Sequence, residues 1–184
     1  MEKELRFLSE DLTAKAESRT IQGYASKYET LSKDLGGFKE IIQRGAFSEA
    51  LAKDHDVIAN INHDDNKILA RSGNNLILKE DPIGLYFELD VPETSYGNDL
   101  LINVRSGNVS KCSFAFSVGA DTWDTMTDEG LPIRTIQKID HLYDVAIVTV
   151  PAYEDTGVAI RSLQKIQGID DETKLRIESA RYYE

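Results

Sequence analysis

The sequence predicts a mainly β protein of the α+β class, whose strands form a closed or nearly closed antiparallel sheet with helices at its edges. Many short apolar segments recur along the chain, and turn signals rich in Asp, Asn, Gly and Pro separate them. Few segments have the periodicity of a helix. Many short strands combined with few helices favour a sheet of this kind.

The length and composition are those of an ordinary globular protein. With 184 residues the chain can bury a core without the support of disulfides or metals. We expect one domain over residues 1–165 and a helical tail over 166–184. The net charge of −11 argues against binding nucleic acid through a basic face. No apolar run approaches the roughly 18 residues of a membrane span, and the N-terminus has no signal-peptide core. One cysteine excludes an internal disulfide and a cysteine-rich metal site. We therefore expect a cytoplasmic protein without cofactor or metal.

The first third of the chain predicts strands and one helical turn. Residues 4–28 read as a hairpin that is broken by charged residues near positions 16–18. Residues 38–47 fit either a strand or a short turn of helix. Residues 48–53 then predict a helical turn, because apolar residues recur there at helical spacing.

A strand over residues 56–62 is closed by His63. Alternation places His63 at the end of the inward row of that strand. A histidine in such a position is usually a satisfied core or rim residue, so the pattern alone leaves its role open. His55 lies between two aspartates and is expected to be solvated.

The middle of the chain predicts three further strands and a helix. Ser95 or Asn98 can cap the helix, and Gly107 stops it. The three short strands, which turn residues separate, cover residues 67–71, 75–80 and 84–91.

The strand over residues 109–118 has two different faces. Its apolar face carries Cys112, Phe114, Phe116 and Val118, whereas Lys111, Ser113, Ala115 and Ser117 form a small and polar face. The apolar row would hold Ser113 on a rigid platform, which suits a nucleophile. The alternative is a half-buried strand whose serines are ordinary.

The last third predicts a loop, two strands, an apolar stretch and a helix. The acidic residues 121–129 read as a mobile loop. Strands follow over residues 132–137 and 138–150, the second ending at a proline that cannot extend a central ladder. Residues 156–161 are apolar, and residues 170–183 have a helical pattern.

Asp144 interrupts an apolar row of the strand over residues 138–150. Alternation groups it with Leu142, Ala146 and Val148. Burying a carboxylate in an apolar row destabilises the fold by roughly several kcal/mol unless the carboxylate has a hydrogen-bonding or charged partner. An inward histidine is the natural partner, and the alternatives are a position at the sheet rim or a buried arginine.

Several motifs in this order resemble the prohead (capsid maturation) serine proteases of tailed phages, whose fold is similar to that of the herpesvirus assemblins. The resemblance extends from Gly23-Tyr24-Ala25 to Val158. Its other motifs are Glu40-Ile41-Ile42 with Gly45-Ala46-Phe47, Asn62-His63-Asp64, Gly84-Leu85-Tyr86, Ser113-Phe114-Ala115-Phe116, and the run from Asp144 through Pro151 to Tyr153.

This resemblance implies site residues. The nucleophile of the family falls on Ser113, its general base on His63 and its third member on Asp144. The family also implies a backbone oxyanion donor near Ala152 and Tyr153.

Two positions depart from the family pattern. Cys112 stands where methionine is common, and Asp144 stands where glutamate is common. A thiol nucleophile is therefore an alternative, but alternation buries Cys112 on the apolar face and keeps its thiol protonated.

The resemblance implies a phage- or prophage-encoded serine endopeptidase that acts inside the assembling prohead in the host cell cytoplasm. Its substrates would be the scaffold protein, the major capsid protein or both, and it would also cleave itself. We expect weak activity of the isolated protein. Activity would require oligomerisation, or the ordering of the site by substrate or subunits that bind at the loop over residues 121–129. Nucleic acid and membrane are not expected partners. The alternatives are a catalytically silent assembly factor with the same fold, and a cellular protease or binding domain of similar fold.

Overall fold

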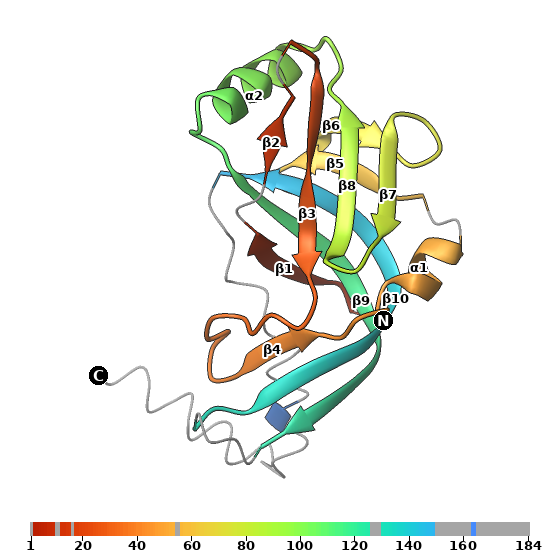
Figure 1. Cartoon of the computed structure of the whole chain (residues 1–184), viewed down its shortest axis with the longest axis vertical. Helices are drawn as coiled ribbons and strands as arrows, with labels where there is room; N and C mark the ends of the chain where they lie inside the picture. The colour runs from red at the N-terminus through yellow and green to blue at the C-terminus, as the bar shows by residue number, and fades with distance from the viewer. Residues whose placement is uncertain are drawn as a thin grey trace.

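The computed structural model describes residues 2–9, 12–15, 17–53, 56–125, 130–149 and 163–164, and these form two β-sheets (Figure 1). The larger sheet has the order β1 (Glu4–Ser9), β9 (Lys111–Asp124), β10 (Ile133–Val148), β5 (Ile58–Ile61) and β6 (Asp64–Arg71), and β4 (Lys39–Ile42) also pairs with β10. The smaller sheet has the order β2 (Thr13–Ala14), β3 (Thr20–Lys27), β8 (Gly84–Asp90) and β7 (Leu76–Glu80). The helices are α1 (Ser48–Ala52) and α2 (Ser95–Arg105).

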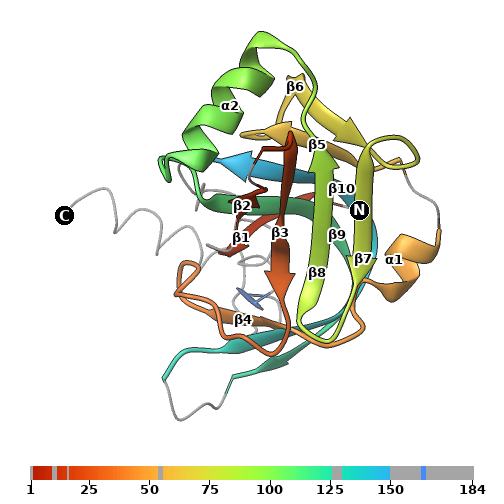
Figure 2. The same ribbon diagram turned by 45° about the horizontal axis from the view of Figure 1, so that its top comes forward.

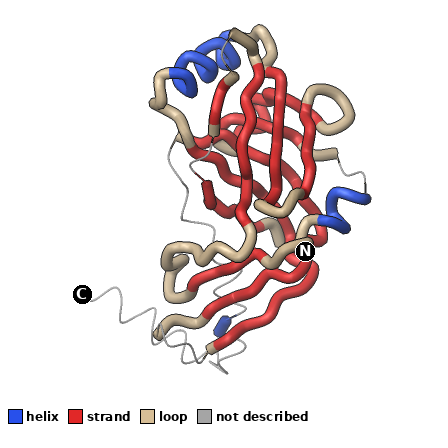
Figure 3. The backbone as a smooth tube through the Cα atoms, viewed as in Figure 1, coloured by secondary structure: helices blue, strands red, loops and turns tan. Residues whose placement is uncertain are grey.

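Neither sheet closes into a barrel within the part of the chain that the structure describes, so the predicted closed or nearly closed antiparallel sheet, a β-barrel of the herpesvirus assemblin type, is wrong. The larger sheet is also mixed, because β4 and β5 both run parallel to β10. The strand β10 is long and irregular: its first half pairs with β4 and its second half with β5, and register shifts lie between the halves. Such bulges bend a strand and increase its twist. The sheet therefore curves without closing, while the α+β class holds, with both helices at the edges of the sheets (Figure 3).

The main hydrophobic core lies between the two sheets. The strands β3, β8 and β7 run across the curved pair β9 and β10 (Figure 2). Phe87 of the smaller sheet and Phe114 and Phe116 of the larger sheet are fully buried, and Phe47 beside α1 packs edge-on against Phe114. Burying each such ring contributes about 1.5–3 kcal/mol, so this aromatic cluster anchors β9 firmly.

The expected hairpin over residues 4–28 is confirmed only in part, because β2 pairs antiparallel with β3 but β1 lies outside that hairpin. The first strand, β1, pairs with β9 in the larger sheet, whereas β3 pairs with β8 in the smaller sheet. Alternation identifies strands in this segment, but it carries no information about their partners. The edge strand β1 therefore lies directly beside the strand of Ser113.

The expected acidic loop over residues 121–129 is partly a strand. The strand β9 continues to Asp124, opposite Ile133 of β10, and β10 is one strand where the sequence predicts two. We call residues 119–125 and 130–138 the distal hairpin, which projects from the body of the protein (Figure 1). Its Trp123 packs against Phe38 at a ring distance of 5.2 Å and against the guanidinium of Arg134. The polar composition of this segment is typical of loops, but these contacts keep it in a strand conformation.

The other predicted elements in the described residues are confirmed. Residues 39–42 form a strand, α1 occupies the predicted helical turn, and three strands follow β5 in the predicted order. The helix α2 is capped by the Thr94 side chain, so the predicted cap at Ser95 or Asn98 is wrong. The predictions for His55, residues 156–161 and the tail over 166–184 lie outside the described residues. No helix in the described part is long and apolar enough to cross a membrane.

Candidate active site

Ser113 lies in the centre of the larger sheet, opposite Phe7 of β1 on one side and Ala146 of β10 on the other. The predicted apolar row is confirmed, since Cys112, Phe114 and Phe116 are fully buried. The small and polar face is also buried at Ser113 and Ser117. Ser113 is thus held by a strand that is covered on both sides.

His63 lies in the two-residue turn that joins β5 to β6. Both Asn62 and His63 have a positive φ, of 54° and 57°, as in a type I′ turn. Asn and Gly are the residues that favour this conformation, and a bulkier residue there costs about 1–2 kcal/mol. The Asn62 side chain stabilises the turn, because its Oδ1 accepts a hydrogen bond of 3.0 Å from the backbone N–H of Thr149. The turn, rather than the inward row of a strand as alternation predicts, directs the His63 ring.

Asp144 follows an irregularity in β10 that reverses the faces of the strand. Leu142 pairs with Phe116 on the core face, but Asp144 pairs with Ala115 on the face of Ser113. Tyr143 is the extra residue at this bulge, so the predicted grouping of Asp144 with Leu142 is wrong. The bulge brings a buried carboxylate to the same side of the sheet as the Ser113 hydroxyl.

The three residues form a continuous chain of contacts. His63 Nε2 lies 2.8 Å from Ser113 Oγ, and His63 Nδ1 lies 2.7 Å from Asp144 Oδ1. The buried carboxylate therefore has the histidine partner that the sequence predicts. A neutral ring with its proton on Nδ1 donates to Asp144 and leaves Nε2 as an acceptor for the serine proton. The side chains of Ser113, His63 and Asp144 are thus connected in one hydrogen-bonded line.

The edge strand β1 and the residue directly before it contact the two ends of this line of three side chains. The backbone carbonyl oxygen of Arg6 lies 2.9 Å from Ser113 Oγ and can accept its proton. At the other end, Lys3 Nζ donates to Asp144 Oδ2 at 3.0 Å. Neither contact is predicted from the sequence, because both depend on the pairing of β1 with β9.

A buried ion-pair network holds β1 in place. Arg6 Nε lies 2.7 Å from Glu40, and Glu4 lies 2.5 Å from Arg6 and 2.8 Å from Arg134. Arg134 also contacts Asp121 of the distal hairpin at 2.6 Å. Burial alone would raise the pKa of Glu4, but its hydrogen bond to Arg134 and the charges of both arginines outweigh burial and lower the pKa. Sequence reasoning missed this network, whose signal is the presence of charges at inward positions of predicted strands.

The remaining predicted features are placed as follows. Cys112 lies in the core on the face opposite Ser113, and its Sγ donates to the Tyr24 carbonyl at 3.3 Å. Ala152 and Tyr153, the predicted oxyanion donors, lie outside the described residues. Within the described residues, no group of three or more His, Cys, Asp or Glu side chains is arranged to hold a metal ion.

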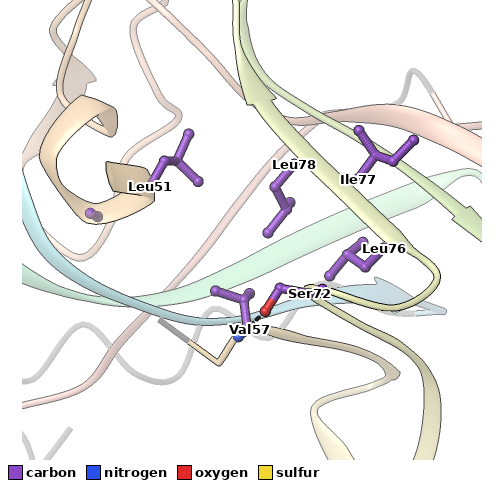
Figure 4. Close-up of a pocket in the computed structure, with 8 residues that line it drawn as sticks. Leu51, Val57, Ser72, Leu76, Ile77 and Leu78 are labelled. Carbon is purple, nitrogen blue, oxygen red and sulfur yellow. Dashed lines mark hydrogen bonds between the residues drawn. The ribbon is translucent and has the colours of Figure 1, made fainter. Parts of the chain in front are cut away.

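A separate pocket of about 250 Å³ lies between α1 and β7 and contains none of the three site residues (Figure 4). Leu51 and Leu78 face each other across it, and the Ser72 hydroxyl at its floor accepts a hydrogen bond from the backbone of Val57. The full lining consists of Ala50, Leu51, Val57, Ser72, Gly73, Leu76, Ile77 and Leu78. This lining has no titratable side chain.

A buried serine in contact with a histidine and a carboxylate is the arrangement of serine hydrolases. The chain belongs to the caudovirus prohead serine protease family, whose model matches residues 3–171. This confirms the resemblance seen in the sequence and identifies the chain as a serine protease of the capsid maturation class.

One solved structure, that of the bacteriophage T4 capsid assembly protease gp21, is similar in fold. The similarity has a TM-score of 0.50 at 14% sequence identity, and it covers 80% of this chain and 99% of the T4 chain. At this identity the likeness shows the fold alone. A search of curated proteins finds no match.

Proposed function

We propose that this chain is a serine endopeptidase in which Ser113 is the nucleophile, His63 the general base and Asp144 the residue that orients the base. The observation that carries the proposal is the chain of contacts of 2.8 Å and 2.7 Å from Ser113 Oγ through both nitrogens of His63 to Asp144. Three elements that are distant in sequence meet there, and membership of a serine protease family supports the same roles.

The proposed reaction proceeds in two halves. Ser113 Oγ attacks a peptide carbonyl carbon while His63 Nε2 takes the hydroxyl proton, and the carbonyl electron pair moves to oxygen. When the C–N bond breaks, His63 gives the proton to the leaving amine and an acyl-serine remains. Water then attacks the ester with His63 again as base, which releases the carboxylic acid and restores Ser113. Asp144 accepts from Nδ1–H throughout and stabilises the charged ring. We assign the oxyanion donors to the backbone N–H groups of Ala152 and Tyr153.

The proposed substrates are the scaffold protein, the major capsid protein or both, together with the chain itself. We place the reaction inside the assembling prohead, in the host cell, with the gene carried by a phage or prophage. Family membership supports this setting, since the family is that of caudovirus prohead proteases. Homo-oligomerisation is part of the same proposal.

The test is the intact mass of the full chain after treatment with a fluorophosphonate, which phosphonylates activated serines. We expect one adduct on the wild type and on a Cys112→Ser variant, and none on Ser113→Ala. An adduct that follows Cys112 instead of Ser113 contradicts the assignment of the nucleophile.

If the isolated protein gives no adduct, the labelling is repeated with co-expressed scaffold and major capsid protein. Cleavage of either protein by the wild type but not by Ser113→Ala supports the proposed substrates. No adduct and no cleavage in the presence of the assembling capsid would overturn the proposal in favour of a silent assembly factor.

A further inference from the structure

Lys3 contacts the oxygen of Asp144 that His63 does not use. Its Nζ lies 3.0 Å from Oδ2, whereas His63 Nδ1 lies 2.7 Å from Oδ1. Lys3 directly precedes β1, where Glu4 pairs with Phe116 of the strand that carries Ser113. The pairing of an edge strand therefore delivers an ammonium group to the carboxylate of the proposed active site.

The two partners differ greatly in exposure. The Asp144 side chain is 2% exposed and the Lys3 side chain is 47% exposed. An ionised carboxylate at that depth is costly unless a charge and hydrogen bonds compensate it. A neutral His63 ring supplies a hydrogen bond without a charge, so the ammonium of Lys3 supplies the missing charge. Because the Lys3 side chain is half-exposed, water can reach the ammonium, which lowers the cost of holding it there.

Tyr143 gives Lys3 a second contact. The Lys3 ammonium lies 5.5 Å from the centre of the Tyr143 ring, a cation–π distance. Tyr143 is the extra residue of the β10 bulge that turns Asp144 towards Ser113, and its ring packs against His141 at 4.3 Å. The bulge thus orients the carboxylate and places an aromatic ring beside the cation that binds it.

We infer that Lys3 is a positioning residue for the proposed peptidase. By binding Oδ2, it fixes the rotation of the Asp144 side chain so that Oδ1 faces Nδ1 of His63, and it places a positive charge beside the carboxylate. An ionised acceptor at Nδ1 holds the ring proton there, which leaves Nε2 free to take the proton of Ser113. This inference rests on the proposed function, since it concerns the activation of Ser113.

The test measures the rate of fluorophosphonate labelling of the full chain under the conditions in which the wild type labels. The variants are Lys3→Ala, Lys3→Met, which keeps an unbranched side chain, and Lys3→Arg, which keeps the charge. Lys15→Ala is the matched control, because Lys15 is 44% exposed and pairs with Glu88 at 2.9 Å on the other sheet. Circular dichroism checks that each variant is folded.

We expect Lys3→Ala and Lys3→Met to lower kinact by about 10- to 100-fold, as for a misplaced catalytic group, with KI nearly unchanged. Lys3→Arg and Lys15→Ala should stay within about threefold of the wild type, since the charge or the site is retained. Ethylammonium chloride should restore part of the rate of Lys3→Ala, while sodium chloride at equal ionic strength should not. The acid limb of the pH profile of kinact/KI should move to higher pH in Lys3→Met, because a lost neighbouring cation makes proton binding easier.

The outcomes separate the inference from the function. A wild type that labels at Ser113, together with a folded Lys3→Met that labels at the same rate and with the same pH profile, overturns the role of Lys3 alone. A loss of rate that ethylammonium does not restore and that leaves the pH profile unchanged reduces Lys3 to a structural residue. A wild type that fails to label even with the assembling capsid overturns the proposed function, and this inference with it.

Discussion

The backbone carbonyl oxygen of Arg6 lies 2.9 Å from the Oγ atom of Ser113, which also contacts His63 Nε2 at 2.8 Å. The hydroxyl has one proton and two acceptors, so it can donate to His63 or to Arg6 but not fully to both. The side chain of the same arginine is held by Glu40 and Glu4 within the buried network. A salt-bridge network in the core therefore determines where the edge strand β1 meets the proposed nucleophile.

Glu40→Gln should destabilise the fold by about 3 kcal/mol, because it leaves buried arginine charge without its main partner. The measurement is urea unfolding followed by the fluorescence of Trp123, the only tryptophan in the chain. Asp140→Asn is the control, since Asp140 pairs with Lys53 at the surface and its loss should cost less than about 1 kcal/mol. Equal midpoints for the two variants would mean that the buried network contributes no more than a surface pair.

The stability of the fold should decrease in acid, and Glu4 should account for part of that decrease. The pKa of Glu4 is lowered from 4.5 in the folded protein by Arg134 and Arg6. A carboxyl group whose folded pKa is depressed contributes stability above its unfolded pKa, and this contribution is lost as the pH falls through the folded pKa. Urea midpoints between about pH 7 and pH 3 should fall less steeply in Glu4→Gln than in the wild type. Parallel curves for the two proteins would contradict this assignment.

Asn62→Ala should destabilise the protein more than Asn62→Gly, by about 1 kcal/mol, although both remove the same side-chain hydrogen bond to Thr149. The reason is the φ of 54° at this position, which glycine adopts freely and alanine does not. Thermal unfolding measures the difference. The rate of fluorophosphonate labelling should follow the same order, since this turn carries His63. If alanine is tolerated as well as glycine, the positive φ at position 62 is not maintained in solution.

Asp144→Asn should slow labelling of Ser113 by about 10³- to 10⁴-fold, because an amide cannot hold His63 in its working tautomer with the same charge. Its effect on stability should be small, since Lys3 is half-exposed and can be hydrated once its partner is neutral. Asp144→Glu keeps a carboxylate at this position on a longer side chain, so this variant should retain measurable labelling. A loss of labelling in Asp144→Asn that matches a loss of folded protein would indicate a structural role only.

Several features follow from the sequence because they depend on local spacing. The period of two along residues 109–118 places Cys112, Phe114 and Phe116 in the core and Ser113 on the opposite face, as the structure shows. The need of a buried Asp144 for a partner predicts a histidine contact, which the structure contains at 2.7 Å. The order of the motifs predicts the family, which the family model confirms over residues 3–171.

Other features were decided only by the tertiary structure. The parallel pairing of β5 with β10, the bulge at Tyr143 and the positive φ of His63 bring the three site residues together. Alternation gives the face of a side chain only while the strand is regular, and one extra residue reverses every face that follows. Strand partners and sheet closure depend on contacts between distant segments. For that reason the predicted barrel was wrong, and the contacts of Lys3 and Arg6 with the site could be found only in the folded chain.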